Sequence, residues 1–133
     1  MIKRELYMSR IRPFIGTELI KVMTGIHRCG KSVMLELIKQ ELTESGVSPT
    51  QFISINFEDM SYSHLQTAQA LHDEITARAA KIEGKVYLFF DEIQEVKDWE
   101  KCINSFRVSL DCDIYITGSN AKLLSGELAT YLG

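Results

Sequence analysis

This chain of 133 residues lacks several features that would mark particular classes of protein. No apolar run approaches the ~20 residues that a membrane-spanning helix needs, so we expect no association with a membrane. The net charge is only −3, so charge alone does not predict nucleic-acid binding. No repeat, low-complexity tract or linker is visible, which predicts a single domain over residues 1–133.

Cysteines are few, and their pattern does not indicate a metal site. Cys29, Cys102 and Cys112 lack the spacing of zinc ligands. An odd number of cysteines without a recognisable secretory signal indicates a reducing compartment, and we expect a cytoplasmic protein. Cys29 could be redox-sensitive if it lies at a helix N-terminus, although a small loop residue is the simpler interpretation.

The most informative pattern that is present extends from Gly25 to Ser32 and reads Gly-Ile-His-Arg-Cys-Gly-Lys-Ser. It matches G-x-x-x-x-G-K-[ST], the phosphate-binding loop (Walker A motif) of nucleoside triphosphatases, in which glycines let the backbone approach a phosphate. Lys31 would reach the β- and γ-phosphates, and Ser32 would bind Mg²⁺. The alternative is a glycine-rich turn before a helix. The predicted nucleotide contacts are Gly25, His27, Arg28, Cys29, Gly30, Lys31, Ser32 and Val33.

Strand and helix signals alternate along the chain, which predicts a three-layer α/β fold with a parallel sheet. The segment 86–90 is apolar throughout, as in a parallel strand that is covered on both faces. Asp98 is expected to cap the helix that follows it. The expected strands are 19–24, 51–57, 86–90 and 114–117. The expected helices are 4–14, 31–45, 63–81, 99–110 and 121–132.

A second motif follows the apolar strand, where Asp91 and Glu92 occur in succession. Ligands of open α/β sheets bind at the carboxyl ends of the strands. Asp91 would hold Mg²⁺, and Glu92 would activate the attacking water as a general base. The pair is typical of hydrolytic ATPases rather than GTPases or nucleotide kinases, and no guanine-specifying Asn-Lys-x-Asp is present, so ATP is the expected nucleotide.

A third motif, Thr117-Gly118-Ser119-Asn120, ends the last predicted strand. A polar side chain at this position would lie between the carboxylates and the γ-phosphate. Asn120 is the better candidate for this contact, because an amide can bond both phosphate and water, and Ser119 is the alternative. A simple asparagine helix cap would look the same in sequence.

The three motifs in this order resemble an AAA+-type ATPase. The segments Asp91-Glu92-Ile-Gln and Gly118-Ser119-Asn120 are similar in sequence to those of bacterial and archaeal AAA-superfamily ATPases that often carry a C-terminal domain of uncharacterised function. The resemblance implies a P-loop sheet in which the phosphate-loop strand lies between the strand of the third motif and a fifth strand. We expect the chain to contain four of these five strands, and to be the N-terminal part of a longer ATPase without its lid and C-terminal domain.

The expected activity is therefore Mg²⁺-dependent hydrolysis of ATP, weak in the isolated chain. The alternatives are a nucleotide-dependent switch without turnover, a P-loop kinase, and a DNA-associated ATPase that depends on a missing part or a partner. The basic residues Lys3, Arg4, Arg10 and Arg12 could form a patch for DNA or an acidic partner, or the solvated face of a helix. An uncovered sheet edge would favour self-association.

Overall fold

The fold is a parallel β-sheet between two layers of helices, seen in a computed structural model that describes residues 4–24, 28–119 and 129–131. The strands are β1 (Ile20–Met23), β2 (Phe52–Asn56), β3 (Val86–Asp91), β4 (Cys112–Thr117) and β5 (Ala129–Tyr131). The α-helices are α1 (Arg4–Ile11), α2 (Arg28–Glu44), α3 (Ala68–Ala79) and α4 (Trp99–Ser109). Short 3₁₀ turns are η1 (Arg12–Phe14), η2 (Pro49–Gln51), η3 (Met60–Leu65) and η4 (Ile93–Glu95).

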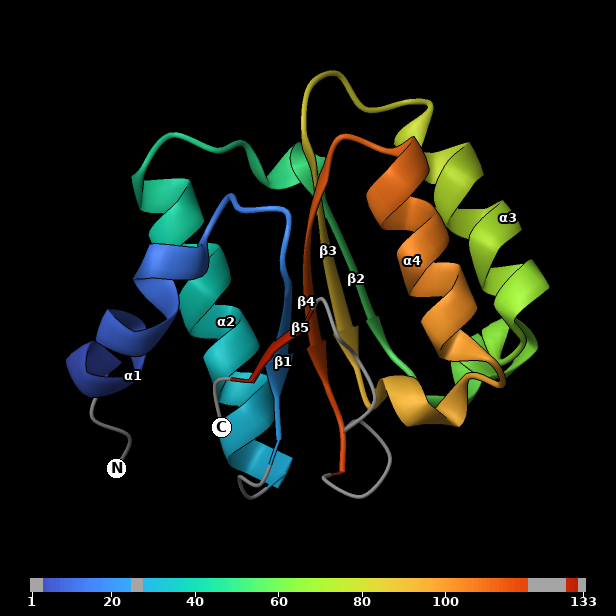
Figure 1. Ribbon diagram of the computed structural model, residues 1–133, viewed down its shortest axis with the longest axis horizontal. Helices are drawn as coiled ribbons and strands as arrows, with labels where there is room; N and C mark the ends of the chain where they lie inside the picture. Colours follow the sequence, from blue (N-terminus) through green and yellow to red (C-terminus); the bar gives the residue numbers. More distant parts are fainter. Residues whose placement is uncertain (1–3, 25–27, 120–128, 132–133) are drawn as a thin grey trace.

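The strands lie in the order β2-β3-β4-β1-β5, and every neighbouring pair is parallel. Helices α1 and α2 cover one face of the sheet, and α3 and α4 cover the other (Figure 1). The predicted three-layer α/β fold is confirmed. Parallel strands need crossover connections, and the helices that provide these connections also cover the two apolar faces.

Each face of the sheet has its own hydrophobic core, and the middle strands contribute to both. Leu88 and Phe90 of β3 pack toward α3 and α4, whereas Phe89 between them packs with α1 and α2. On the second face, the Phe89 ring stacks on Tyr115 with a centroid distance of 5.2 Å. This double burial explains the uninterrupted apolar run of β3, which was predicted from the sequence.

The sheet has a fifth strand, so the expectation of four strands is wrong. The helix expected over 121–132 is also wrong at residues 129–131, while residues 121–128 and 132 lie outside the described part of the chain. Residues Ala129–Tyr131 form β5 and pair with Ile20–Val22 of β1. A run of three residues is too short to show strand periodicity in sequence, and pairing with the free edge of β1 determines its conformation. The edge of β1 that was expected to favour self-association is therefore covered by β5.

Two smaller expectations about helices also need correction. The helix expected over 63–81 is divided into the 3₁₀ turn η3 and helix α3, because Thr67 is extended and its side chain accepts a hydrogen bond from the N–H of Ala70. Asp98 does precede α4, but its φ of 58° is left-handed and its side chain makes no capping hydrogen bond. Its predicted role as a capping side chain is therefore wrong.

Candidate functional site

The carboxyl ends of β1, β3 and β4 converge at one edge of the sheet, where α2 also begins. In Figure 1 this edge is at the bottom, below the arrowheads of the strands. The register places Met23 of β1 beside Thr117 of β4, and the N–H of Gly118 donates to the carbonyl oxygen of Met23 at 3.3 Å. The structure thus brings the ends of strands that carry the three sequence motifs to one place, as parallel topology requires.

Asp91, the last residue of β3, makes two hydrogen bonds that use different carboxylate oxygens. Ser32 of α2 donates its hydroxyl to Asp91 Oδ2 at 2.7 Å. The Thr117 hydroxyl at the end of β4 donates to Asp91 Oδ1. Asp91 is only 8% exposed, so these two bonds determine which way its carboxylate faces. The first bond joins the Gly-Lys-Ser motif directly to the Asp-Glu motif.

Glu92 follows in a strained backbone conformation. Its φ of 58° and ψ of 52° are left-handed, which is uncommon for a residue with a side chain and costs about 1–3 kcal/mol. Its N–H donates to Thr117 Oγ1 at 3.0 Å. Its carboxylate Oε1 accepts from the side-chain amide of Gln94 at 2.7 Å. Backbone strain held in place by such contacts is typical of functional sites.

A pocket of about 340 Å³ opens beside the Ser32–Asp91 contact, between α2 and the ends of β2 and β3. One face of α2 and polar residues of β2 line it together. Ser54 Oγ of β2 is buried and has no hydrogen-bond partner among the described residues. The lining residues are Ser32, Leu35, Glu36, Lys39, Ser54, Ile55, Asn56, Tyr62, Phe89 and Asp91.

The oxygen atoms at this site suit Mg²⁺ that arrives with a nucleotide. Ser32 and Asp91 offer one hydroxyl and one carboxylate, and Mg²⁺ is usually held by one or two carboxylates, waters and substrate phosphates. Within residues 4–24, 28–119 and 129–131, no group of three or more His, Cys, Asp or Glu residues could hold a metal ion by itself. The donor set therefore fits a shared metal site rather than a protein cage.

A family model for an AAA domain matches residues 17–133. The chain belongs to this AAA domain family. Membership indicates a P-loop ATPase-like module that binds a nucleotide. Among the helices that the structure describes, none is long and apolar enough to cross a membrane.

This AAA domain is similar to proteins of a bacterium and an archaeon. An uncharacterized protein of Haemophilus influenzae is 42% identical over 132 residues, which is 99% of this chain and 33% of that protein. An uncharacterized protein of Methanocaldococcus jannaschii is 38% identical over 114 residues, 85% of this chain and 24% of that protein. The chain thus spans a third or less of the length of these relatives.

The structure describes some of the predicted site residues in full, others by their backbone alone, and some not at all. Ser32, Asp91 and Glu92 lie at the same edge of the AAA domain, and Val33 is exposed beside Ser32. The backbone of residues 28–31 forms the first turn of α2, with Gly30 half-buried. The predicted residues that lie outside the description are Gly25, His27 and Asn120, and the side chains of Arg28, Cys29 and Lys31.

Sequence reasoning did not identify the partners that hold the two carboxylates. Thr117 belongs to the third motif, yet its contacts with Asp91 and Glu92 follow only from the neighbouring positions of β3 and β4. Gln94 bonds Glu92 from the next turn, η4. A hydroxyl residue as the last residue of a buried strand was the available signal for Thr117.

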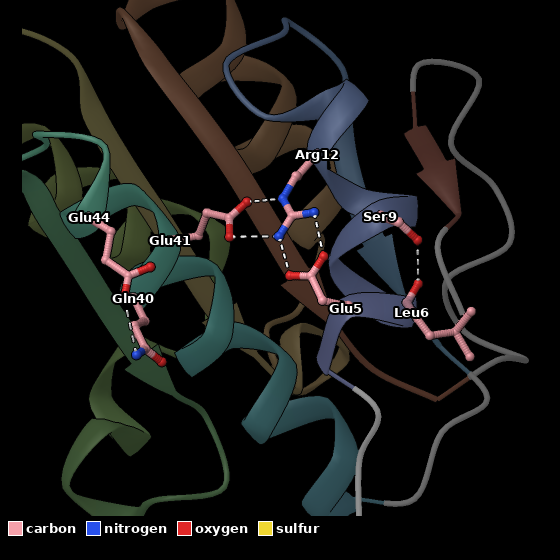
Figure 2. Close-up of polar contacts among 7 residues, drawn as sticks. All are labelled: Glu5, Leu6, Ser9, Arg12, Gln40, Glu41 and Glu44. Atoms are coloured by element: carbon pink, nitrogen blue, oxygen red, sulfur yellow. Dashed lines mark hydrogen bonds and ion pairs between the residues drawn. The ribbon is translucent and has the colours of Figure 1, made fainter.

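Among the basic residues near the N-terminus, Arg12 makes ion pairs with acidic side chains. Arg12 lies between Glu5 of α1 and Glu41 of α2, and its guanidinium donates to both carboxylates (Figure 2). The two contacts with Glu5 are 3.0 and 2.7 Å long. The hydrogen bonds of Glu5 and Glu41 raise the pKa of Arg12 above its usual range. Arg12 therefore ties two helices together, whereas Arg10 is exposed.

Proposed function

We propose that this AAA domain binds ATP with Mg²⁺ and hydrolyses it. The observation that carries this proposal is the 2.7 Å hydrogen bond from Ser32 to Asp91, between residues 59 positions apart in sequence. A serine after Gly-Lys and an aspartate at the end of a buried strand are the two protein groups that share Mg²⁺ in P-loop nucleoside triphosphatases. Their contact supports a site already arranged for the metal.

Each residue of the site has a separate role in this proposal. Lys31 and the loop N–H groups bind the phosphates, while Ser32 and Asp91 hold Mg²⁺. The bound metal supplies positive charge that neutralises the phosphate oxygens during transfer. Glu92 orients a water molecule and accepts its proton. Asn120 contacts the γ-phosphate and distinguishes ATP from ADP.

Calorimetric titration of MgATP into the chain tests the binding step. We expect Lys31→Ala to weaken binding at least about thirtyfold, because removing one member of a desolvated charge pair costs about 2 kcal/mol or more. The matched control is Lys101→Ala, at an exposed position on α4, which should bind like wild type. Equal binding by wild type and Lys31→Ala would exclude the proposed phosphate site.

Turnover tests the role of Glu92. Glu92→Gln should keep MgATP affinity but lower kcat by about 10²-fold or more, the usual contribution of a general base. Glu95→Gln, an exposed neighbour on η4, is the matched control and should hydrolyse ATP normally. Hydrolysis by Glu92→Gln at the wild-type rate would refute this assignment. Tight binding without turnover in the wild type would instead support a nucleotide-dependent switch.

A further inference from the structure

Thr117 connects the two carboxylate residues of the site through a single hydroxyl group. It is the last residue of β4 and is fully buried, with 0% of its surface exposed. Its Oγ1 accepts the N–H of Glu92 at 3.0 Å and lies in hydrogen-bond contact with Asp91 Oδ1. These partners are 25 and 26 residues away in sequence, so the contacts depend on the pairing of β3 with β4.

The direction of both hydrogen bonds follows from the chemistry of the groups. A threonine hydroxyl has one proton and can accept further bonds through its lone pairs. A backbone N–H can only donate, so the Glu92 contact uses a lone pair of Thr117. An ionised carboxylate can only accept, so the single hydroxyl proton goes to Asp91 Oδ1. The Thr117 hydroxyl can therefore make both hydrogen bonds at the same time.

This arrangement divides the two oxygens of Asp91 between two tasks. Oδ1 is held by Thr117, which leaves Oδ2 beside the Ser32 hydroxyl at 2.7 Å. Rotation of the carboxylate would break the bond to a fully buried hydroxyl and leave that hydroxyl without a hydrogen-bond acceptor, which is unfavourable in the interior. The same hydroxyl also supports the left-handed backbone of Glu92, since it satisfies the Glu92 N–H.

We propose that Thr117 is a positioning residue that presents Asp91 Oδ2 to the Mg²⁺ of the bound nucleotide and fixes the backbone from which Glu92 acts. This inference rests on the proposed function, because it assigns Thr117 a role in the same Mg-nucleotide site. Thr117 does not touch the nucleotide in this scheme and acts only through Asp91 and Glu92. Groups that orient metal ligands in this way typically contribute 10–100-fold to metal affinity or activity.

The test compares ATP affinity with Mg²⁺ and with EDTA, by calorimetry on the wild type and on Thr117→Val. Valine has the same shape but no hydroxyl, so it removes both hydrogen bonds with little change in packing. We expect Thr117→Val to lose at least about tenfold of the gain in affinity that Mg²⁺ gives, while affinity in EDTA is unchanged. We expect kcat to fall more than KM rises, and Thr117→Ser to restore both properties.

Tyr115→Phe is the matched control, because it also removes one buried hydroxyl of β4 that is bonded to a carboxylate, here Asp113 at 2.6 Å. It should lower the thermal midpoint and leave the Mg²⁺ effect intact. If Thr117→Val does not fold, Thr117→Ala tests the same loss of the hydroxyl.

The outcomes separate this inference from the function on which it rests. A wild type that does not bind ATP would overturn the proposed function together with the role of Thr117. A wild type with a clear Mg²⁺ effect that Thr117→Val or Thr117→Ala retains would overturn the role of Thr117 alone. An equal loss in Tyr115→Phe would show that the effect comes from lower stability and would also overturn it.

Discussion

At the scale of single residues, the most unusual feature is an ion pair inside the protein. Lys21 of β1 and Asp113 of β4 bond each other, and neither side chain is exposed to solvent. Asp113 also accepts from the hydroxyl of Tyr115 at 2.6 Å and from the N–H of Gly16 at 2.9 Å. Lys21 donates in addition to the carbonyl oxygen of Thr17 at 3.0 Å. The network joins the segment before β1 to the middle of the sheet.

Burial shifts the pKa of Lys21 and that of the neighbouring Tyr115 in opposite directions. Burial lowers the pKa of Lys21, and the charge of Asp113 partly offsets this effect. Burial, with the nearby Asp113 carboxylate, raises the pKa of Tyr115. Both shifts arise because a charge in the interior loses its hydration. The loss of either charged partner would therefore leave the other one buried without compensation.

Removal of one member of the buried pair should destabilise the protein strongly. We expect Lys21→Met to lower the free energy of unfolding by about 3–5 kcal/mol, because it leaves the buried Asp113 carboxyl group without its positively charged partner. Urea unfolding followed by circular dichroism measures this change. Lys85→Met is the control, since Lys85 pairs with exposed Asp111 at 3.7 Å and should cost less than about 1 kcal/mol. Similar costs for both variants would contradict this account.

Motifs with a characteristic spacing predicted which residues lie close together, while the roles assigned to those residues stay predictions. Ser32 and Asp91 were predicted to share a site, and the structure places them in contact. Thr117 and Gln94 were not assigned to that site, because their roles depend on side-chain directions at the strand ends. The Lys21–Asp113 pair was also not predicted, since buried charges carry no periodic signal and depend on the β1–β4 register.

At the scale of elements, α1 is attached to the rest of the protein by an apolar and a polar contact. Met8 and Ile11 are buried in the core beneath α2. Arg12, directly after α1, bonds Glu5 and Glu41 at the surface (Figure 2). The apolar contact supplies most of the attachment, because exposed ion pairs contribute little and are screened by salt.

Arg12→Ala should therefore loosen α1 without unfolding the protein. We expect faster amide hydrogen exchange across Arg4–Ile11, with exchange in β3 unchanged, because local opening of an edge helix does not require global unfolding. Hydrogen exchange with mass spectrometry measures both regions in one experiment. Arg10→Ala, from the exposed side of α1, is the control and should exchange like wild type. Unchanged exchange in α1 of Arg12→Ala would show that the ion pairs do not hold the helix.

Most elements could be predicted from sequence, and the exceptions share a cause. The strand 86–90 and helix α4 show clear patterns of apolar residues, and both are present. The break before α3 depends on the extended conformation of Thr67, and β5 depends on pairing with β1. Such features arise from contacts between distant segments, which local composition does not record.

At the scale of the whole molecule, the buried thiol of Cys102 and the half-buried thiol of Cys112 should make stability depend on alkaline pH. Burial raises the pKa of Cys102 to about 12 and that of Cys112 to about 11, from 9.0. Above pH 9 these thiols lose their protons more readily in the unfolded chain than in the folded protein. Their contribution to the free energy of unfolding is therefore fully present below pH 9 and is lost as pH rises toward 11–12. The lowered pKa of Lys21 acts in the opposite direction over part of this range.

Comparison of wild type with Cys102→Ala isolates the contribution of one thiol. Above pH 9, wild type should lose up to about 1.4 kcal/mol more per pH unit than the variant, because one pKa unit corresponds to that energy. Urea unfolding between pH 8 and pH 10.5 gives both curves, and the contributions of Lys21 and the tyrosines cancel in the difference. Parallel curves would mean that Cys102 ionises as easily in the folded protein as in the unfolded chain.

The position of β1 in the sheet has a consequence for the order of synthesis. β1 leaves the ribosome before the other described strands, yet its partners are β4 and β5, at residues 112–117 and 129–131. A nascent chain that ends before β4 can pair β2 with β3, but β1 then lacks both of its partners. Strand pairings between distant segments form slowly, and domains generally fold as units. The segment that leads into the Gly-Lys-Ser motif therefore lacks the strands that hold it in place until residues 112–131 have been synthesised.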